Sequence, residues 1–185
     1  MDALLADLRA ALGDGAVRVG LTELGLYRRD ASNMSGAAAV VCLPTDTDQV
    51  AACVVAANRH GVAFVARGSG TGLAGGAVPS DGAVVVVTTR MNRVLSVDPV
   101  NRQAWVQPGL LNLDLTRQLV HLGLHFAPDP SSQQTCSIGG NVANNSGGPH
   151  CLAEGVTASH VLAVRVVLPD GTLTTLGGED PEPTG

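Results

Sequence analysis

Residues 66–76 read Ala66-Arg67-Gly68-Ser69-Gly70-Thr71-Gly72-Leu73-Ala74-Gly75-Gly76, directly after a short apolar run that predicts a β-strand. The glycines permit backbone conformations in which successive N–H groups point to one side. Such a nest of N–H groups binds anionic oxygens, most often those of phosphate. Ser69 and Thr71 add hydroxyl donors, and Arg67 is expected either to assist a phosphate or to lock the loop through its own hydrogen bonds.

Gly70 to Gly75 match the pattern G-x-G-x-x-G, but the surrounding sequence argues against a Rossmann fold. In that fold the motif opens a helix, whose N-terminus holds the pyrophosphate. Residues 76–82 show no helical period, so the Rossmann interpretation is rejected. The chain also contains no lysine, which a Walker A loop requires. A loop made only for flexibility remains an alternative, disfavoured by the arginine and two hydroxyls among the glycines.

A second segment rich in glycine and hydroxyl groups follows at residues 128–132 and 136–148. The prolines Pro128 and Pro130 fix the first part, and the glycines of the second part permit close approach to a flat or anionic group. The sequence predicts this segment as a second loop. Two such loops can line one long ligand.

The residues around the first loop predict a βαβ unit. Strands are expected at 37–43 and 62–66, and between them a helix that ends at Gly61. Thr45 and Asp48 form the expected capping box at the start of this helix. The two strands of such a unit run parallel.

The pattern then changes to short strands at close spacing and one further helix. These elements are expected at 83–88, 94–98, 103–107, 111–122 (helix), 161–168 and 172–176, with a turn at Asn101-Arg102 and a hairpin turn at Pro169-Asp170-Gly171. The predicted fold class is therefore α+β, with a βαβ lobe at about 36–90 and a mixed or antiparallel lobe at 91–176. Residues 1–35 are expected to form an N-terminal helical segment, and 36–185 a domain that is incomplete at its C-terminal end, where 177–185 is expected to be a loop.

Composition excludes several classes of function. The net charge is −5 and aromatic residues make up 2%, which disfavours nucleic acid as a partner. The absence of lysine removes Schiff-base chemistry. No apolar run reaches the length of a membrane span, and the N-terminus lacks the pattern of a signal peptide, so the expected compartment is the cytoplasm. The spacing of the four cysteines fits neither a zinc site nor a redox pair. Three of them lie in apolar or glycine-rich surroundings and are expected to be small buried apolar residues.

Taken together, the two glycine-rich segments resemble the FAD-binding domain of the FAD-linked oxidases of the vanillyl-alcohol-oxidase type. The resemblance is strongest to the branch that contains the glycolate oxidase FAD subunit and D-lactate dehydrogenases. It runs from about Tyr27 to Leu176. It is carried by residues 44–50, 67–76, 90–95, 128–130, 138–143, 145–152 and 167–171.

The resemblance implies a two-lobed domain with FAD extended between the lobes. It implies that the pyrophosphate is bound by Arg67, Gly68, Ser69, Gly70, Thr71 and Gly72, with Gly75 and Gly76 beside it. Along the ribityl chain and flavin it implies Pro130, Ser131, Ser137, Gly139 and Gly140, with Asn144 and Gly148 continuing the same wall. At the adenine end it implies Val161. Some relatives carry a histidine in the glycine loop that attaches the flavin covalently. Thr71 occupies that position here, which implies non-covalent FAD.

The resemblance further implies oxidation of a small 2-hydroxy acid such as glycolate or D-lactate, with further oxidase subunits as possible partners. No catalytic residue is assigned, because relatives carry the substrate and metal site downstream of residue 185. The histidines show no metal-ligand spacing, so no metal site is predicted. His150 is expected to shape a turn, with no orienting carboxylate nearby, and His160 is expected to have no partner. Asp129 is expected to serve a turn.

Two alternatives stay open at this point. One is a non-catalytic, truncated fragment. The other is a module that binds a different nucleotide or a sugar phosphate through the Arg67 loop alone.

Overall fold

Strand β4 (Val84–Val87) forms the centre of the first lobe, and all four of its valines are buried. In this computed structural model, which describes residues 1–178, β4 pairs in parallel with β2 (Val40–Cys42) on one side and β3 (Phe64–Arg67) on the other. A continuous run of β-branched residues is typical of a parallel strand covered on both faces. The strand order in this sheet is β1-β2-β4-β3.

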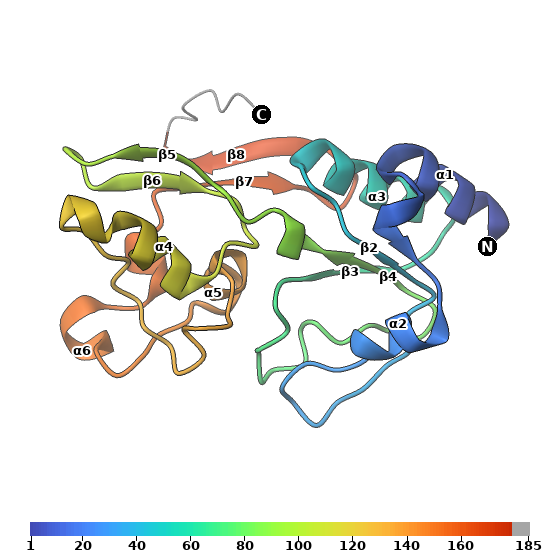
Figure 1. Cartoon of the computed structure of the whole chain (residues 1–185). Helices are drawn as coiled ribbons and strands as arrows, with labels where there is room; N and C mark the ends of the chain where they lie inside the picture. Colours follow the sequence, from blue (N-terminus) through green and yellow to red (C-terminus); the bar gives the residue numbers. More distant parts are fainter. Residues whose placement is uncertain (179–185) are drawn as a thin grey trace.

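Helix α3 (Thr47–Arg59) connects β2 to β3, which confirms the predicted βαβ unit and its parallel strands (Figure 1). The predicted capping box was placed one residue too early. The N-cap is Asp46, whose side chain accepts a hydrogen bond from the N–H of Gln49, while Gln49 Oε1 accepts from the N–H of Thr45. The helix ends where expected, with Gly61 at φ +63°.

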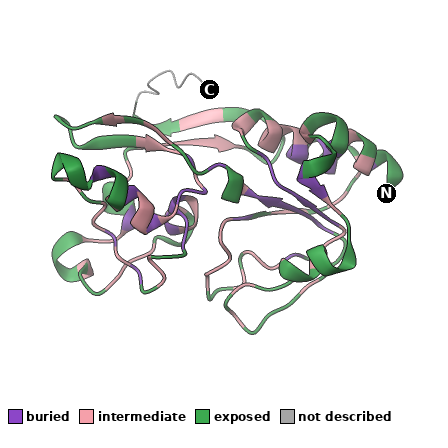
Figure 2. Cartoon of the chain, viewed as in Figure 1, coloured by how far each residue is buried: buried purple, intermediate pink, exposed green. Residues whose placement is uncertain are grey.

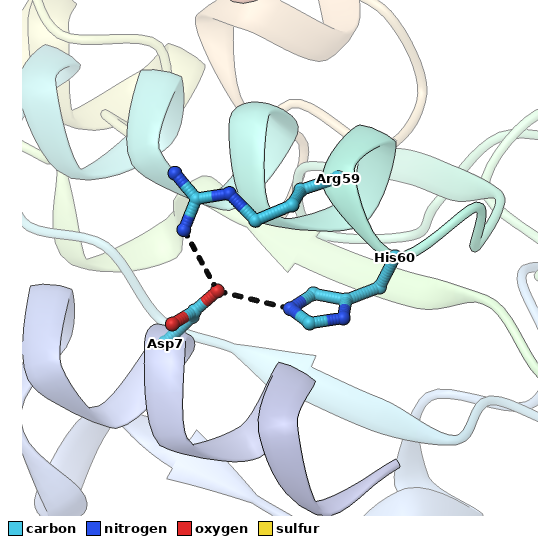
Figure 3. A network of polar contacts seen from close by, with 3 residues as sticks. All are labelled: Asp7, Arg59 and His60. Atoms are coloured by element: carbon cyan, nitrogen blue, oxygen red, sulfur yellow. Dashed lines mark hydrogen bonds and ion pairs between the residues drawn. The ribbon is translucent and has the colours of Figure 1, made fainter.

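The N-terminal segment packs on this lobe. Helix α1 (Asp2–Leu12) lies beside α3, and its Leu4 and Leu8 belong to the same core as β2, β4 and α3. The segment also contributes helix α2 (Leu21–Leu26), which lies within the helical segment expected at 1–35. Strand β1 (Val17–Arg18), antiparallel to β2, was not predicted. In Figure 3, Asp7 of α1 accepts from Arg59 at 3.0 Å and pairs with His60 at 2.9 Å. This network ties α1 to the end of α3.

The second lobe is built from two hairpins and the helices beside them. Its elements are β5 (Val94–Asp98), β6 (Gln103–Val106), α4 (Asn112–Leu119), α5 (Ile138–Asn144), α6 (Cys151–Glu154), β7 (Ala163–Val167) and β8 (Leu173–Gly177). β5 pairs with β6 and β7 with β8, both antiparallel, as the sequence predicts. The α+β fold class is thus confirmed. The expected loop at 177–185 begins later, since Gly177 ends β8, and residues from 179 onward lie outside the described part of the chain.

Buried residues gather in two places (Figure 2). The larger core surrounds β2 and β4. The smaller core is formed by Leu110, Leu115, Leu119 and Ile138, with apolar residues of the first hairpin packed against it. Three cysteines, Cys42, Cys53 and Cys136, are buried free thiols as expected, and Cys151 is half-buried. Among residues 1–178, no helix is long and apolar enough to span a membrane.

Candidate functional site: two facing segments between the lobes

The glycine loop leaves β3 and contains no helix, as predicted. Within the described chain, the backbone N–H groups of residues 68–76 donate no hydrogen bond to the protein, although most of these residues are half-buried. Backbone N–H groups that have no acceptor within the protein are left to pair with water or with a ligand. A run of such amides in a glycine-rich loop is suited to an acceptor-rich ligand, of which a phosphate group is the best-known type.

At two positions of this loop, the backbone has a positive φ that favours glycine. Gly70 has φ +73°, and a Cβ placed there would lie 2.1 Å from Nη2 of Arg67. Gly75 has φ +78°, and its Cβ would lie 2.4 Å from Sδ of Met34. The backbone therefore turns in conformations that other residues adopt only with strain, and it passes close to neighbouring side chains.

The contacts of Arg67 favour the second of its two expected roles, which is to lock the loop through its own hydrogen bonds. Its side chain is buried, donates to the carbonyl of Ala77 at 3.3 Å, and lies with its guanidinium 5.6 Å from the centre of the Tyr27 ring. Burial lowers the pKa of Arg67, while the negative charge of Asp30 opposes that shift. The guanidinium thus holds the two ends of the loop together.

The loop faces the start of helix α5. A Cβ on Gly68 would lie 2.3 Å from Ser137 Oγ and 3.9 Å from the Gly140 nitrogen. At the other end of α5, a Cβ on Gly72 would lie 3.8 Å from Oδ1 of Asn144. The structure therefore brings the first predicted segment against three of the residues predicted from the second.

The second segment is not the loop that the sequence predicts. Residues 138–144 form helix α5, with Ser137 as N-cap accepting from the Gly140 N–H, and with Asn145 in the left-handed conformation at its end. The pair Gly139-Gly140 has low helix propensity and conceals the helix in the sequence. The cap residue and tertiary contacts outweigh that propensity.

Several other predicted residues have contacts within the protein. Gly139 donates to the Pro108 carbonyl and packs on that proline, so a Cβ would lie 2.7 Å from Pro108 Cβ. Gly148 packs on Asp129, whose carbonyl oxygen would lie 2.0 Å from a Cβ. Pro130 is buried and Ser131 is exposed beside it. These glycines are explained by close packing of the chain on itself.

Val161 lines an open cavity of about 1650 Å³, bordered mainly by the two hairpins with α4 and α5. Gly139 also borders this cavity, but among the described residues none of 67–76 does. The predicted place of Val161 at the adenine end therefore gains no support from the loop geometry.

Two sets of contacts that support the site were not predicted from the sequence. Residues 27–36 cover the glycine loop, with the Ala31 N–H donating to the Gly72 carbonyl at 3.1 Å. Asn112 of α4, fully buried, donates from Nδ2 to the Pro128 carbonyl at 2.9 Å and to Asn141 Oδ1 at 3.0 Å. It thereby joins the proline loop to α5. The sequence carries no local signal for either contact, because the partners lie far apart along the chain.

Two histidine predictions were wrong. Oδ2 of Asp129 lies 2.5 Å from Nδ1 of His150, so this histidine has an orienting carboxylate. Asp129 therefore pairs with a side chain and does not serve a turn alone. The hydrogen bond lowers the pKa of Asp129 and raises that of His150. His160 also has partners: its Nε2 lies 2.7 Å from the Glu154 carbonyl oxygen, and its ring makes an edge contact with Phe126. In residues 1–178 no cluster of three or more potential metal ligands is found.

A βαβ lobe whose glycine loop presents unpaired amides, set against a second α+β lobe, defines a nucleotide-cofactor-binding domain outside the Rossmann class. The chain belongs to the family described as FAD binding domain, whose model matches residues 38–177. The predicted cofactor, FAD, is thus confirmed at the level of the family.

Curated relatives support this membership, and a solved structure shares the fold. The glycolate oxidase subunit GlcD of Escherichia coli is 46% identical over 140 residues, which are 76% of this chain and 28% of that protein. The D-2-hydroxyglutarate dehydrogenase of Stutzerimonas stutzeri is 33% identical over 175 residues, 94% of this chain and 38% of that protein. An alkyldihydroxyacetonephosphate synthase structure shares the fold, with TM-score 0.86 and 23% identity over 99% of this chain and 39% of that one. The chain thus spans less than half the length of these proteins.

The residues present fit FAD. Within the described residues, the amides of 68–76 that the protein leaves unpaired match the acceptor oxygens of a pyrophosphate, and the absence of a side chain at Gly68 lets this loop pack directly against Ser137.

Proposed function

We propose that this chain is the FAD-binding part of an oxidoreductase that oxidises a small 2-hydroxy acid such as glycolate or D-lactate. The observation that carries the FAD site is the run of unpaired amides at 68–76 facing Ser137 and Gly140. The substrate class is supported by relatives named glycolate oxidase subunit and D-lactate dehydrogenase, which are 46% and 39% identical over the matched regions.

In this proposal the amides of 68–76 bind the pyrophosphate, and Ser137, Gly140 and Asn144 form the wall that orients the flavin end. Pro130, Ser131 and Gly148 border the same wall. Bound flavin supplies the acceptor for a hydride equivalent, while the protein supplies position and shields the ring from water. Arg67 acts indirectly, because it holds the loop through Ala77 and Tyr27.

The proposal includes non-covalent FAD, since Thr71 stands in the loop where a histidine would be needed for attachment. Denaturation of the FAD-loaded protein, followed by ultrafiltration, should release all flavin into the filtrate. Flavin that stays with the denatured chain would overturn this part.

The substrate class is tested by adding glycolate, D-lactate or L-lactate, without oxygen, to an FAD-loaded protein in which this chain is joined to the downstream region where relatives carry the substrate site. Bleaching of the flavin band by glycolate and D-lactate, with L-lactate as control, is the expected result. If FAD is bound but neither acid bleaches it, the cofactor assignment stands and the substrate assignment fails for this chain.

A further inference from the structure

The pair formed by Asp129 and His150 joins two parts of the second segment that lie far apart along the chain. Asp129 lies in the proline loop, and His150 lies in the turn from Gly148 to Cys151, where it is the N-cap residue of α6. Predicted cofactor-binding residues stand next to both members: Pro130 follows Asp129, and Gly148 precedes His150 by two positions. The pair therefore spans the predicted flavin wall.

Asp129 is held in place from several sides. It lies between Pro128 and Pro130, both buried, which restrict the backbone. The Pro128 carbonyl accepts from the buried Asn112, and the Asp129 carbonyl packs against Gly148. The Asp129 side chain is 21% exposed, whereas that of His150 is 73% exposed. A fixed carboxylate thus holds a solvent-facing imidazole.

We propose that Asp129 and His150 are a positioning pair, called here the Asp129–His150 latch. This ion pair holds the proline loop against the Gly148–Cys151 turn and so keeps the flavin wall in place around FAD. This inference rests on the proposed function. The latch is a charge-assisted hydrogen bond, which is stronger than its neutral counterpart. It needs no contact between His150 and substrate.

Charge state decides the strength of this latch. Two acidic groups raise the pKa of His150: Asp129 through its hydrogen bond and charge, and Glu154, one turn along α6, through its charge. The same hydrogen bond lowers the pKa of Asp129. At pH values between these two pKa values both side chains are charged, and the latch is strongest. It weakens as the pH rises through the raised pKa of His150, because the imidazolium loses its proton. It also weakens as the pH falls through the lowered pKa of Asp129.

The test compares the wild type with His150→Asn, which keeps a neutral donor near the Nδ1 position, and with Asp129→Asn. The Kd for FAD is measured at about pH 6 and about pH 9, on either side of the imidazole titration. In the wild type we expect Kd to rise with pH. In both variants we expect Kd at the lower pH to be about two- to five-fold higher than in the wild type, with little change on raising the pH. His121→Asn, at an exposed histidine in another helix, is the matched control and should keep the wild-type profile.

A second measurement needs no FAD. Hydrogen exchange of residues 128–135 and 145–151 in the FAD-free protein should be faster in His150→Asn than in the wild type at the lower pH, and the two should converge at the higher pH. Equal exchange of both proteins at both pH values would overturn the latch. If exchange responds as expected but the wild type binds no FAD, the latch stands and the proposed function fails. If FAD binds with the same Kd and pH profile in all variants, the positioning role is wrong.

Discussion

Gly68 and Ser137 lie in direct apposition, so that a Cβ at position 68 would come within 2.3 Å of the Ser137 hydroxyl oxygen. The two residues belong to different lobes and are the point at which the glycine loop meets helix α5. Ser137 is also the N-cap of α5. The contact therefore links the position of the glycine loop to the start of this helix.

Gly68→Ala is expected to open this contact and to weaken FAD binding. The added methyl group must displace either the loop or Ser137, and we expect Kd to rise by about ten-fold or more, which corresponds to ~1.4 kcal/mol. Titration of FAD against absorbance or fluorescence gives the value. Gly25→Ala, at an exposed glycine with no atom within 4 Å of the new Cβ, is the control and should leave Kd unchanged. Failure of the double variant Gly68→Ala/Ser137→Ala to recover any affinity would argue against the collision as the cause.

Removal of the N-cap hydroxyl is expected to destabilise the second lobe. Ser137→Ala leaves the Gly140 N–H without its side-chain acceptor, and loss of such a cap costs about 0.5–2 kcal/mol. Urea unfolding measures the change, and Ser137→Asp, which restores an acceptor, should recover part of it. Equal stability of all three proteins would show that the cap contributes nothing.

Asn112→Ala is expected to destabilise the protein and loosen the proline loop. The variant leaves the Pro128 carbonyl without its donor in a buried setting, and one unpaired buried group costs about 1–3 kcal/mol. Asn141 Oδ1 loses the same donor but keeps the Cys136 thiol, 3.7 Å away. The free energy of unfolding should fall accordingly. Asn92→Ala, outside this network, serves as a comparison, and an equal loss in both variants would contradict the assigned role.

The contact between α1 and α3 is expected to make stability depend on acid pH. Hydrogen bonds from His60 and Arg59, in that order, lower the pKa of Asp7 from its ordinary value of 3.8. A lowered folded-state pKa contributes stability that is present above the unfolded-state pKa and is lost as the pH falls through the folded-state pKa. Asp7→Asn should therefore be less stable than the wild type near neutral pH, and the two unfolding curves should converge in acid. A gap that stays constant at every pH would contradict this.

Local signals explain what the sequence could predict. Gly61 ends α3, Gly123 ends the helical turn after α4, and Asp170-Gly171 turns the last hairpin, because each of these depends on residues close together in the chain. The glycine loop after β3 was predicted for the same reason. Its unpaired amides follow from the glycine conformations that the sequence already permits.

Long-range contacts explain what the sequence could not predict. Strand β1 has two residues, too few for any period to be visible, and forms because β2 offers an edge. Helix α5 is hidden by Gly139-Gly140 and is fixed by its cap and by packing on Pro108. Asp129 meets His150 only in the folded chain. Side-chain pairs of this kind depend on tertiary structure, which local propensity does not encode.

Absorption spectroscopy of the purified chain shows whether residues 68–76 and α5 hold FAD. The protein is mixed with FAD, freed of excess ligand, and compared with Gly68→Ala treated in the same way, with circular dichroism confirming that both are folded. Our account predicts that the wild type retains flavin absorption close to one FAD per chain and that Gly68→Ala retains much less. A folded wild-type protein that emerges without flavin absorption would contradict the assignment of residues 68–76 and α5 as an FAD site.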